Sequence, residues 1–187
     1  MPRPASTFEK GIVFGLFARE DFAHAERGLT EIRDLGATSV SIMIPWVTPD
    51  VRSIVMAPRG DMTPSDTALS AAIQKARALG LSVLLMPFLY VDHMAEGEWR
   101  GTLAPPDWDA WFARYGEFVL HYAKLASEEG VGWFSIGSEL CSTEQRREDW
   151  LRLIARVRAV YRGKLTYSAN WDHREAIRFA DHLDILG

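Results

Sequence analysis

The stretch Glu129-Gly130-Val131-Gly132-Trp133-Phe134-Ser135-Ile136-Gly137-Ser138-Glu139-Leu140 decides the fold. Gly130 stands where a helical pattern ends, and a glycine just past a helix can take the left-handed conformation that closes it. The apolar run from Val131 to Ile136 is typical of a strand that is buried on both faces. Glu139 comes directly after that run. The stretch therefore predicts a helix, a turn and a strand that carries one carboxylate to a sheet edge.

The same helix, glycine and apolar run recur along the chain. Further copies stand at Leu35-Gly36 into residues 40–44, Leu79-Gly80 into residues 81–89, and Arg162-Gly163 into residues 165–169. Two more apolar runs cover residues 12–17 and 183–186, which makes about six strands. Buried strands that alternate with helices predict a parallel sheet wrapped by helices.

Alternating strands and helices fit either a closed barrel or an open doubly wound sheet. No GxGxxG or Walker sequence follows any strand, so the usual phosphate-binding reason for the open sheet is missing. We therefore predict an α/β fold of the (β/α)8 TIM-barrel type. A complete barrel has eight units and at least about 200 residues. We expect residues 1–187 to form a single barrel domain that is incomplete at its C-terminus.

The helical segments carry start signals and apolar stripes. Thr63-Pro64-Ser65-Asp66 predicts a helix start with the Thr63 hydroxyl as cap, and Asp107 is expected to cap a later helix. The inner stripe of that later helix is Trp108, Trp111, Phe112, Tyr115, Phe118, Val119 and Tyr122, and a further helix has Trp150, Ile154, Val157 and Tyr161. Stripes at spacings of three and four predict helices that cover a sheet with one face.

Composition narrows the class of protein. The chain is 48% hydrophobic and carries a net charge of −4, and it lacks a Lys/Arg cluster, which argues against nucleic acid as a partner. Cys141 is the only cysteine, so an internal disulfide is excluded. Residues 1–10 lack the apolar segment of a secretory signal, and no run approaches the length of about 20 residues that spans a bilayer. These features predict a cytoplasmic protein without a membrane partner, and none indicates an oligomeric state.

Aromatic and polar residues follow the predicted strands, where the active site of a barrel lies. They are Pro45-Trp46, Tyr90-Val91-Asp92-His93 with Glu98-Trp99-Arg100-Gly101, Ser138-Glu139, and Asn170-Trp171-Asp172-His173. Indole rings stack on the C–H faces of sugars, and neighbouring Arg, Asn, Asp or His groups bond the hydroxyls. We therefore predict a sugar site formed by Trp46, Trp99, Trp171, Arg100, Asn170, Asp172 and His93. The alternative is that the tryptophans fill the barrel mouth.

Glu139 is the candidate catalytic residue. Acid/base catalysis requires a carboxyl group in a partly desolvated position, and the end of a buried strand provides one. The alternative is a solvated loop residue or an ion-pair partner of Arg100 or Arg146.

Other candidate groups are weaker. His93 and His173 each follow an aspartate, but HxxxH and HxH spacings are absent, so hydrogen bonding is favoured over metal binding. Asp172 is a second catalytic carboxylate or, more simply, a cap for a helix near Arg174. Cys141 is interpreted as a packed thiol. No metal and no cofactor is expected.

Several blocks in a fixed order resemble a known family. The blocks are Trp99-Arg100-Gly101, Ile136-Gly137-Ser138-Glu139-Leu140, Val157-Arg158-Ala159-Val160-Tyr161, Leu165-Thr166-Tyr167-Ser168-Ala169-Asn170-Trp171-Asp172 and Leu183-Asp184-Ile185-Leu186-Gly187. From Gly11 to Gly187 the chain resembles the family 113 glycoside hydrolases, β-mannanases with two glutamates on a TIM barrel.

This resemblance implies a retaining hydrolase that acts on β-mannan or a related oligosaccharide, with Glu139 as general acid/base. It also implies that the nucleophile stands at the end of a seventh strand, beyond Gly187. Two positions depart from the expected pattern. Phe88 stands where a histidine is expected, and Ser138 stands where related families have asparagine. Both departures affect contacts to the sugar and leave the carboxylate in place.

Two alternative functions stay open from the sequence. The first is a non-catalytic carbohydrate-binding protein or an inert barrel fragment, because an open barrel leaves unpaired strand edges. The second is a metal-dependent sugar isomerase or epimerase that uses Asp92, His93, Glu139, Asp172 and His173.

Overall fold

The computed structural model describes residues 9–18 and 22–187. Residues 1–8 lie outside the described residues, so the prediction that this end carries no secretory signal stays a prediction. No helix in the described ranges is both long enough and apolar enough to cross a membrane.

Six parallel strands form one sheet in the order of the sequence. They are β1 (Gly11–Gly15), β2 (Ser39–Thr48), β3 (Ser82–Val91), β4 (Trp133–Ser138), β5 (Lys164–Ser168) and β6 (Ile185–Leu186). Each strand pairs in parallel with the next along the chain. Consecutive order without a switch point is the arrangement of a (β/α) barrel.

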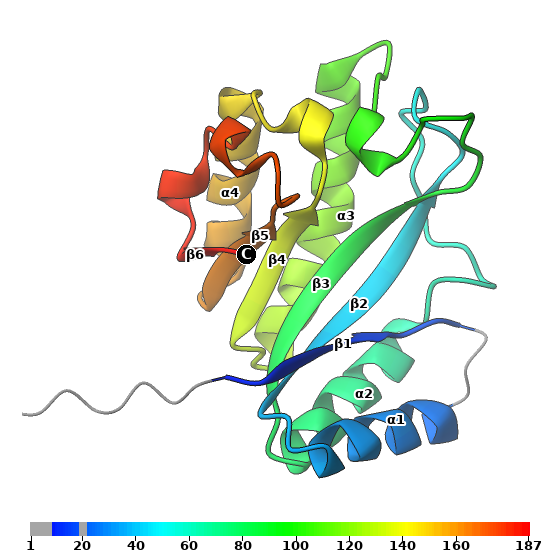
Figure 1. Ribbon diagram of the computed structural model, residues 1–187, viewed down its shortest axis with the longest axis vertical. Coiled ribbons are helices and arrows are strands. Elements are labelled where there is room, and N and C mark those ends of the chain that lie inside the picture. Colours follow the sequence, from blue (N-terminus) through cyan, green and yellow to red (C-terminus); the bar gives the residue numbers. More distant parts are fainter. Residues whose placement is uncertain (1–8, 19–21) are drawn as a thin grey trace, which may run out of the picture.

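The helices all cover the same face of this sheet (Figure 1). They are α1 (Phe22–Asp34), α2 (Asp66–Ala78), α3 (Trp108–Glu128) and α4 (Arg147–Val160), with short 3-10 turns η1 (Arg100–Thr102), η2 (Cys141–Thr143), η3 (Arg174–Ala176) and η4 (Ala180–His182). A doubly wound sheet carries helices on both faces. The one-sided cover therefore confirms the α/β fold of TIM-barrel type, here with six strands.

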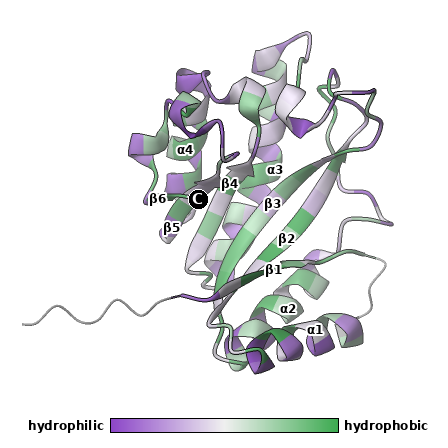
Figure 2. Ribbon diagram, in the orientation of Figure 1, coloured by the Kyte–Doolittle hydropathy of each residue, from purple (hydrophilic) through white to green (hydrophobic). Residues whose placement is uncertain are grey.

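The core lies between the sheet and the helices. On β2, Val40, Ile42 and Ile44 are buried toward the helices, while Ser41 and Met43 alternate with them on the other face. The hydropathy colouring shows strands with many apolar residues in front of helices that carry both apolar and polar residues (Figure 2). The predicted helix stripes are confirmed, since Trp111, Tyr115, Trp150 and Tyr161 are each at most 1% exposed. Other members of the stripes are Phe112, Phe118, Val119, Tyr122, Ile154 and Val157, all buried, while Trp108 is only partly buried.

Helix ends follow the predicted glycine pattern at three of four places. Gly36, Gly80 and Gly130 have φ of +82°, +78° and +63°, so each closes a helix in the left-handed conformation. Gly163 differs because α4 ends on Tyr161 with an extended backbone. A Cβ at Gly163 would lie 2.8 Å from the Gly132 carbonyl oxygen, so close packing requires this glycine.

The cap of α3 is as predicted, and the cap of α2 is not. The Asp107 carboxylate accepts a hydrogen bond from the Ala110 amide at 3.0 Å. The cap of α2 is Ser65, whose hydroxyl accepts from the Ala68 amide. Thr63 lies too early for that role, and its hydroxyl donates instead to the Pro45 carbonyl at 2.7 Å. Thr63 therefore ties the β2–α2 loop to the sheet.

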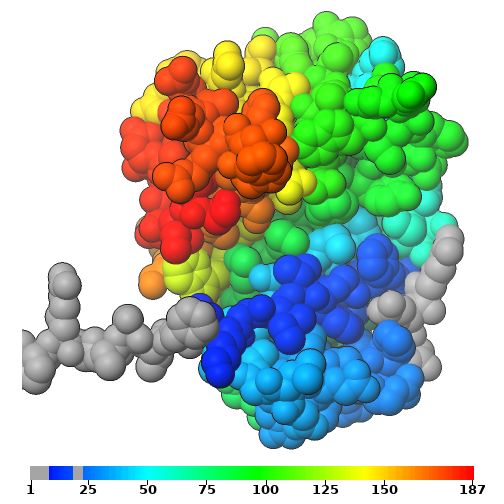
Figure 3. All heavy atoms as spheres, viewed as in Figure 1, coloured from blue at the N-terminus to red at the C-terminus, as the bar shows by residue number. Residues whose placement is uncertain are grey.

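The inner face of the sheet is open to solvent. Val13 on β1 is 61% exposed, and Met43 and Met86 on β2 and β3 are only partly buried. Figure 3 shows this face as a recess between the dark blue β1 and the orange and red segments that follow β5. The face that would form the inner wall of a barrel thus carries exposed apolar side chains in this chain.

Candidate active site

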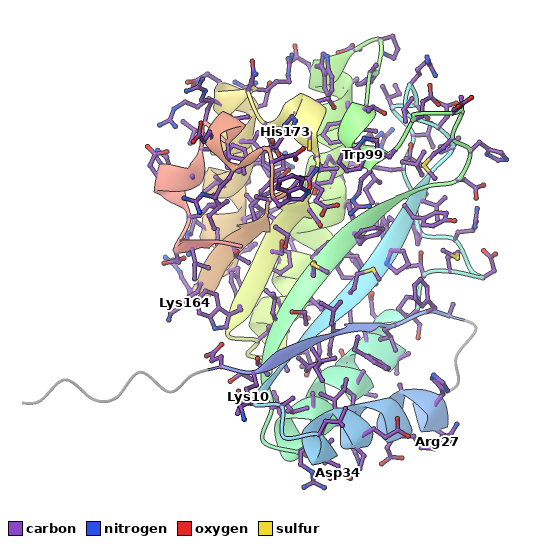
Figure 4. All side chains as sticks on the ribbon, in the orientation of Figure 1. Lys10, Arg27, Asp34, Trp99, Lys164 and His173 are labelled. Atoms are coloured by element: carbon purple, nitrogen blue, oxygen red, sulfur yellow. The ribbon has the colours of Figure 1, made fainter. Side chains whose placement is uncertain are left out.

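The carboxyl ends of the strands meet at one end of the sheet. Trp99, in the loop after β3, and His173, in the loop after β5, lie at this end, and Lys10 and Lys164, before β1 and at the start of β5, lie at the other (Figure 4). The parallel order places every predicted strand-end residue on the same rim. This is the rim on which (β/α) barrels carry their chemistry.

Glu139 follows β4 on this rim in a strained conformation. Its φ is +53°, and it is the one non-glycine residue with positive φ within residues 9–18 and 22–187. Its amide donates to the Ser168 carbonyl on β5 at 2.8 Å, which fixes the backbone. Backbone strain of this kind costs of order 1 kcal/mol or more and concentrates at functional sites.

Arg100 holds the Glu139 carboxylate. Its Nη2 contacts Glu139 Oε2, and its Nε donates to the Ser138 carbonyl at 3.3 Å. The side chains of Arg100 and Glu139 are 24% and 32% exposed, so the ion pair is partly desolvated. Glu139 is therefore both a carboxylate on the rim and an ion-pair partner of Arg100, the two positions that the sequence treated as alternatives.

Two aromatic rings flank the Arg100 guanidinium. Its carbon lies 4.5 Å from the centre of the Phe88 ring on β3 and 5.8 Å from that of Trp99. Phe88, which stands where the family pattern has a histidine, thus packs against the guanidinium of the ion pair. The rings and the guanidinium make an amphipathic wall beside Glu139.

A buried hydrogen-bond chain supports the backbone after Glu139. The Leu140 amide donates to the Tyr167 hydroxyl at 2.8 Å, and that hydroxyl donates to Glu144 Oε1 at 2.9 Å. Glu144 is completely buried, and burial raises the pKa of its carboxyl above the ordinary range. Burial raises the pKa of Tyr167 as well. Sequence reasoning missed Glu144, because a glutamate in a polar segment carries no sign of burial.

The loop after β5 presents its predicted sugar-binding groups to solvent. Trp171 is 90% exposed, and the Asn170 side-chain oxygen accepts from the Trp171 amide at 3.0 Å. Asp172 is exposed as well. The prediction that Asp172 caps the following helix is wrong, because His173 is the residue before η3 and no side chain caps it.

His93 lies in the loop after β3, and its backbone amide donates to the carbonyl of Pro49, the residue after β2, at 2.9 Å. Its imidazole is 82% exposed, with Nδ1 3.3 Å from the Pro49 carbonyl oxygen. The neighbouring Asp92 pairs with Arg59 at 2.8 Å. The isomerase hypothesis required Asp92 and His93 to join Glu139, Asp172 and His173 around a metal. In the described part of the chain, the acid, imidazole and thiol groups that come close enough are a different set: Cys141, Glu144 and His173.

The prediction that Trp46 follows the second strand is wrong. β2 continues to Thr48, so Trp46 lies within it, on the same face as Ile42 and Ile44. Its ring stacks on Phe118 of α3 at 4.8 Å, and its indole N–H donates to the Tyr122 hydroxyl at 3.1 Å. Trp46 therefore belongs to the helix-facing layer, because β2 stays paired with β3 beyond Ile44, as far as Thr48 and Val91.

Trp46 also lines a pocket of about 720 Å³ with Arg59, Thr63, His121 and Tyr122. Glu139 and Arg100 do not line this pocket. The Glu139 side chain is instead 32% exposed beside Arg100 on the rim.

Cys141 lies two residues past Glu139 on η2. Burial is the main cause that raises the pKa of its thiol to about 11, and the Asn170 side chain is a hydrogen-bond partner. The thiol is therefore protonated at neutral pH and is not a nucleophile on its own.

Parallel strands in sequence order, with helices on one side of the sheet and polar and aromatic groups at the strand ends, define the class of (β/α)-barrel proteins. The sequence pattern of Glycoside Hydrolase Family 113 matches residues 10–187. The chain belongs to this family, which confirms the resemblance found in the sequence. Among curated proteins, none matches the sequence.

Solved structures of family members share the fold. A GH113 β-1,4-mannanase is 28% identical with a TM-score of 0.88 over 96% of this chain. The GH113 β-mannanase of Alicyclobacillus acidocaldarius in complex with ManMIm is 27% identical with a TM-score of 0.88 over 97%. The present chain spans 61% of the length of each. An endo-β-1,4-mannanase from Thermotoga petrophila, 12% identical with a TM-score of 0.58, shares the fold alone.

Proposed function

We propose that the whole protein is a retaining glycoside hydrolase of β-mannan, with Glu139 as its general acid/base. Family membership and the mannanase relatives support this reaction and substrate. The observation that carries the role of Glu139 is its strained position on the catalytic rim, fixed by Ser168 and Arg100.

In the proposed mechanism Glu139 protonates the glycosidic oxygen as the bond breaks and later removes a proton from water. The second carboxylate of a retaining enzyme stands about 5–5.5 Å away and forms the covalent glycosyl intermediate. We assign no described residue to that role. We propose that it comes from sequence of the kind that the longer relatives carry outside the matched region.

The sugar site proposed here contains Trp99, Arg100, Asn170, Trp171, Asp172 and His93. Trp171 is the outermost of these groups, since an indole that is 90% exposed offers a whole face for stacking. Trp46 is left out because its ring is already packed on α3.

Glu139→Gln in the whole protein tests the catalytic role. The amide keeps the shape of the side chain and cannot act as acid or base, so kcat on manno-oligosaccharides should fall by about 10² to 10⁴. The matched control is Glu117→Gln, an exposed glutamate on α3 that pairs with Arg114. If Glu139→Gln hydrolyses the oligosaccharides as fast as the control, the assignment of Glu139 is wrong.

A further inference from the structure

Three side chains of types that can bind metals lie close together in the loops after β4 and β5, outside the site assigned above. Cys141 is on η2, Glu144 follows η2, and His173 precedes η3. The Cys141 Sγ, a Glu144 carboxylate oxygen and a His173 ring nitrogen all lie within 4.8 Å of one another. The cluster therefore joins the loop after β4 to the loop after β5.

The Glu144 carboxylate has one occupied and one open oxygen. Oε1 accepts from Tyr167 at 2.9 Å. Oε2 is buried and has no hydrogen-bond partner among the described residues. The His173 Nδ1 atom lies 3.6 Å from it. An unpaired buried carboxylate oxygen is costly, and a bound cation is one way to satisfy it.

The surroundings favour a cation over an anion. Asp172 lies close enough to act electrostatically on both Cys141 and Glu144. Within the described ranges, the side chains that pair with the Glu144 carboxylate are the Tyr167 hydroxyl and the His173 imidazole. A carboxylate, a thiol and an imidazole thus lie close together, with the carboxylate of Asp172 in electrostatic range of the first two.

The ligand types select the metal. Ca²⁺ and Mg²⁺ prefer oxygen ligands, whereas thiolate and imidazole together with one carboxylate suit Zn²⁺. Zinc bonds to such ligands are about 2.0–2.3 Å long, so the three side chains need to approach one another slightly. The His173 side chain is 47% exposed and has room to do so.

We propose that Cys141, Glu144 and His173 bind a divalent transition metal, with Zn²⁺ the best fit, and leave a fourth position open to solvent. The metal would stabilise the thiolate of Cys141 and satisfy Glu144 Oε2. Because Glu144 also holds Tyr167, which holds the Leu140 amide, the metal would brace the backbone next to Glu139. It would equally fix the loop that carries Asn170 and Trp171.

The test is titration of the metal-free protein with Co²⁺ and Zn²⁺, which does not depend on hydrolysis. We expect one equivalent of Co²⁺ to produce a thiolate-to-cobalt charge-transfer band that Zn²⁺ abolishes. Calorimetry with Zn²⁺ should give an affinity that falls at least about 10-fold in Cys141→Ser, Glu144→Gln and His173→Ala, since even outer-shell changes cost that much. The controls His93→Ala and Glu148→Gln remove an exposed imidazole and an exposed carboxylate and should bind as the wild type does.

His173→Ala is the decisive variant, because a half-exposed position tolerates truncation without loss of the fold. Absence of the charge-transfer band in the folded wild type would overturn the proposal. A band that only Cys141→Ser removes would also overturn it, since the thiol would then bind cobalt without Glu144 and His173. Loss of hydrolysis in Glu139→Gln has no bearing on either result, so the two proposals fail separately.

Discussion

Arg100 does more than neutralise Glu139. One guanidinium contacts the carboxylate through Nη2 and the Ser138 carbonyl through Nε, so a planar group locks the side chain and the end of β4 together. Lysine offers a single ammonium at the end of a flexible chain and cannot reproduce both contacts.

Arg100→Lys should therefore lower kcat of the whole protein by about 10- to 100-fold, because loss of a hydrogen bond to a charged group is worth about 1.5–3 kcal/mol. Steady-state kinetics on manno-oligosaccharides measure the effect. Arg114→Lys, in an exposed pair with Glu117, should leave kcat unchanged. Equal kinetics for the two variants would show that Arg100 does not position the carboxylate.

The position of Glu139 at the end of a buried strand could be read from the sequence, and its surroundings could not. The apolar run before it predicts where the strand ends, because burial on both faces requires continuous apolar residues. The hydrogen bond between Tyr167 and Glu144 could not be predicted, because it depends on how the segment after β4 packs against β5. A short turn of this kind leaves no periodic pattern in the sequence.

Strand and helix boundaries show a similar contrast. Gly36, Gly80 and Gly130 act as local signals, because only glycine takes a left-handed conformation without strain. The extension of β2 to Thr48 depends instead on pairing with β3, which continues to Val91. The local apolar pattern ends the strand at Ile44 and predicts that Trp46 follows it. Pairing with the distant β3 extends the strand past Trp46.

The turn between α4 and β5 depends on close packing at Gly163. Gly163→Ala should destabilise the protein by about 1–3 kcal/mol, because the new Cβ would meet the Gly132 carbonyl oxygen at 2.8 Å. Urea unfolding followed by circular dichroism measures the difference. Gly132→Ala is the matched control, since a Cβ there has nothing within 4 Å. A loss of stability in Gly132→Ala as large as that in Gly163→Ala would refute the packing argument.

Asp184 ties β6 to the rest of the sheet. Its Oδ2 accepts from Arg158 at 2.5 Å and from the Leu165 amide at 2.8 Å, and these contacts lower the pKa of the carboxyl, with Arg158 the larger cause. A carboxyl whose folded pKa is depressed stabilises the protein above its unfolded pKa of about 4 and loses that contribution as pH falls through the folded value.

Asp184→Asn should therefore lower the free energy of unfolding at pH 6. It should have no effect at low pH, where Asp184 of the wild type is protonated in both the folded and the unfolded state. The effect should stay below about 1 kcal/mol, because the pair is largely exposed. Urea unfolding at pH 6, 4 and 3 measures it, with Glu175→Gln as the control for removal of an exposed carboxylate. A difference that does not change between pH 6 and pH 3 would contradict the ionic origin.

The chain as a whole presents an uncovered apolar sheet face. β1 and β6 each pair on one side only among the described residues, and Val13 on β1 is 61% exposed. Such edges and faces promote association between copies.

A protein of residues 1–187 should therefore form concentration-dependent dimers or larger species, and Val13→Lys should reduce them several-fold. Light scattering after size exclusion measures the mass at each concentration. Val55→Lys changes a valine of similar exposure, 58%, in the β2–α2 loop and should leave association unchanged. A monomer at all concentrations in the wild type would show that this face is stable in water.

Gly36, Gly80 and Gly130, which close helices in the left-handed conformation, lie at the opposite end of the sheet from the strand-end carboxylate of Glu139. The residues that end α1, α2 and α3 are thus remote from those proposed to bind the sugar. Selection for a new carbohydrate can rebuild the loops around Trp99 and Trp171 while the turns at Gly36, Gly80 and Gly130 stay as they are. Mutations that change the carbohydrate bound can therefore arise without disturbing the turns on which folding depends.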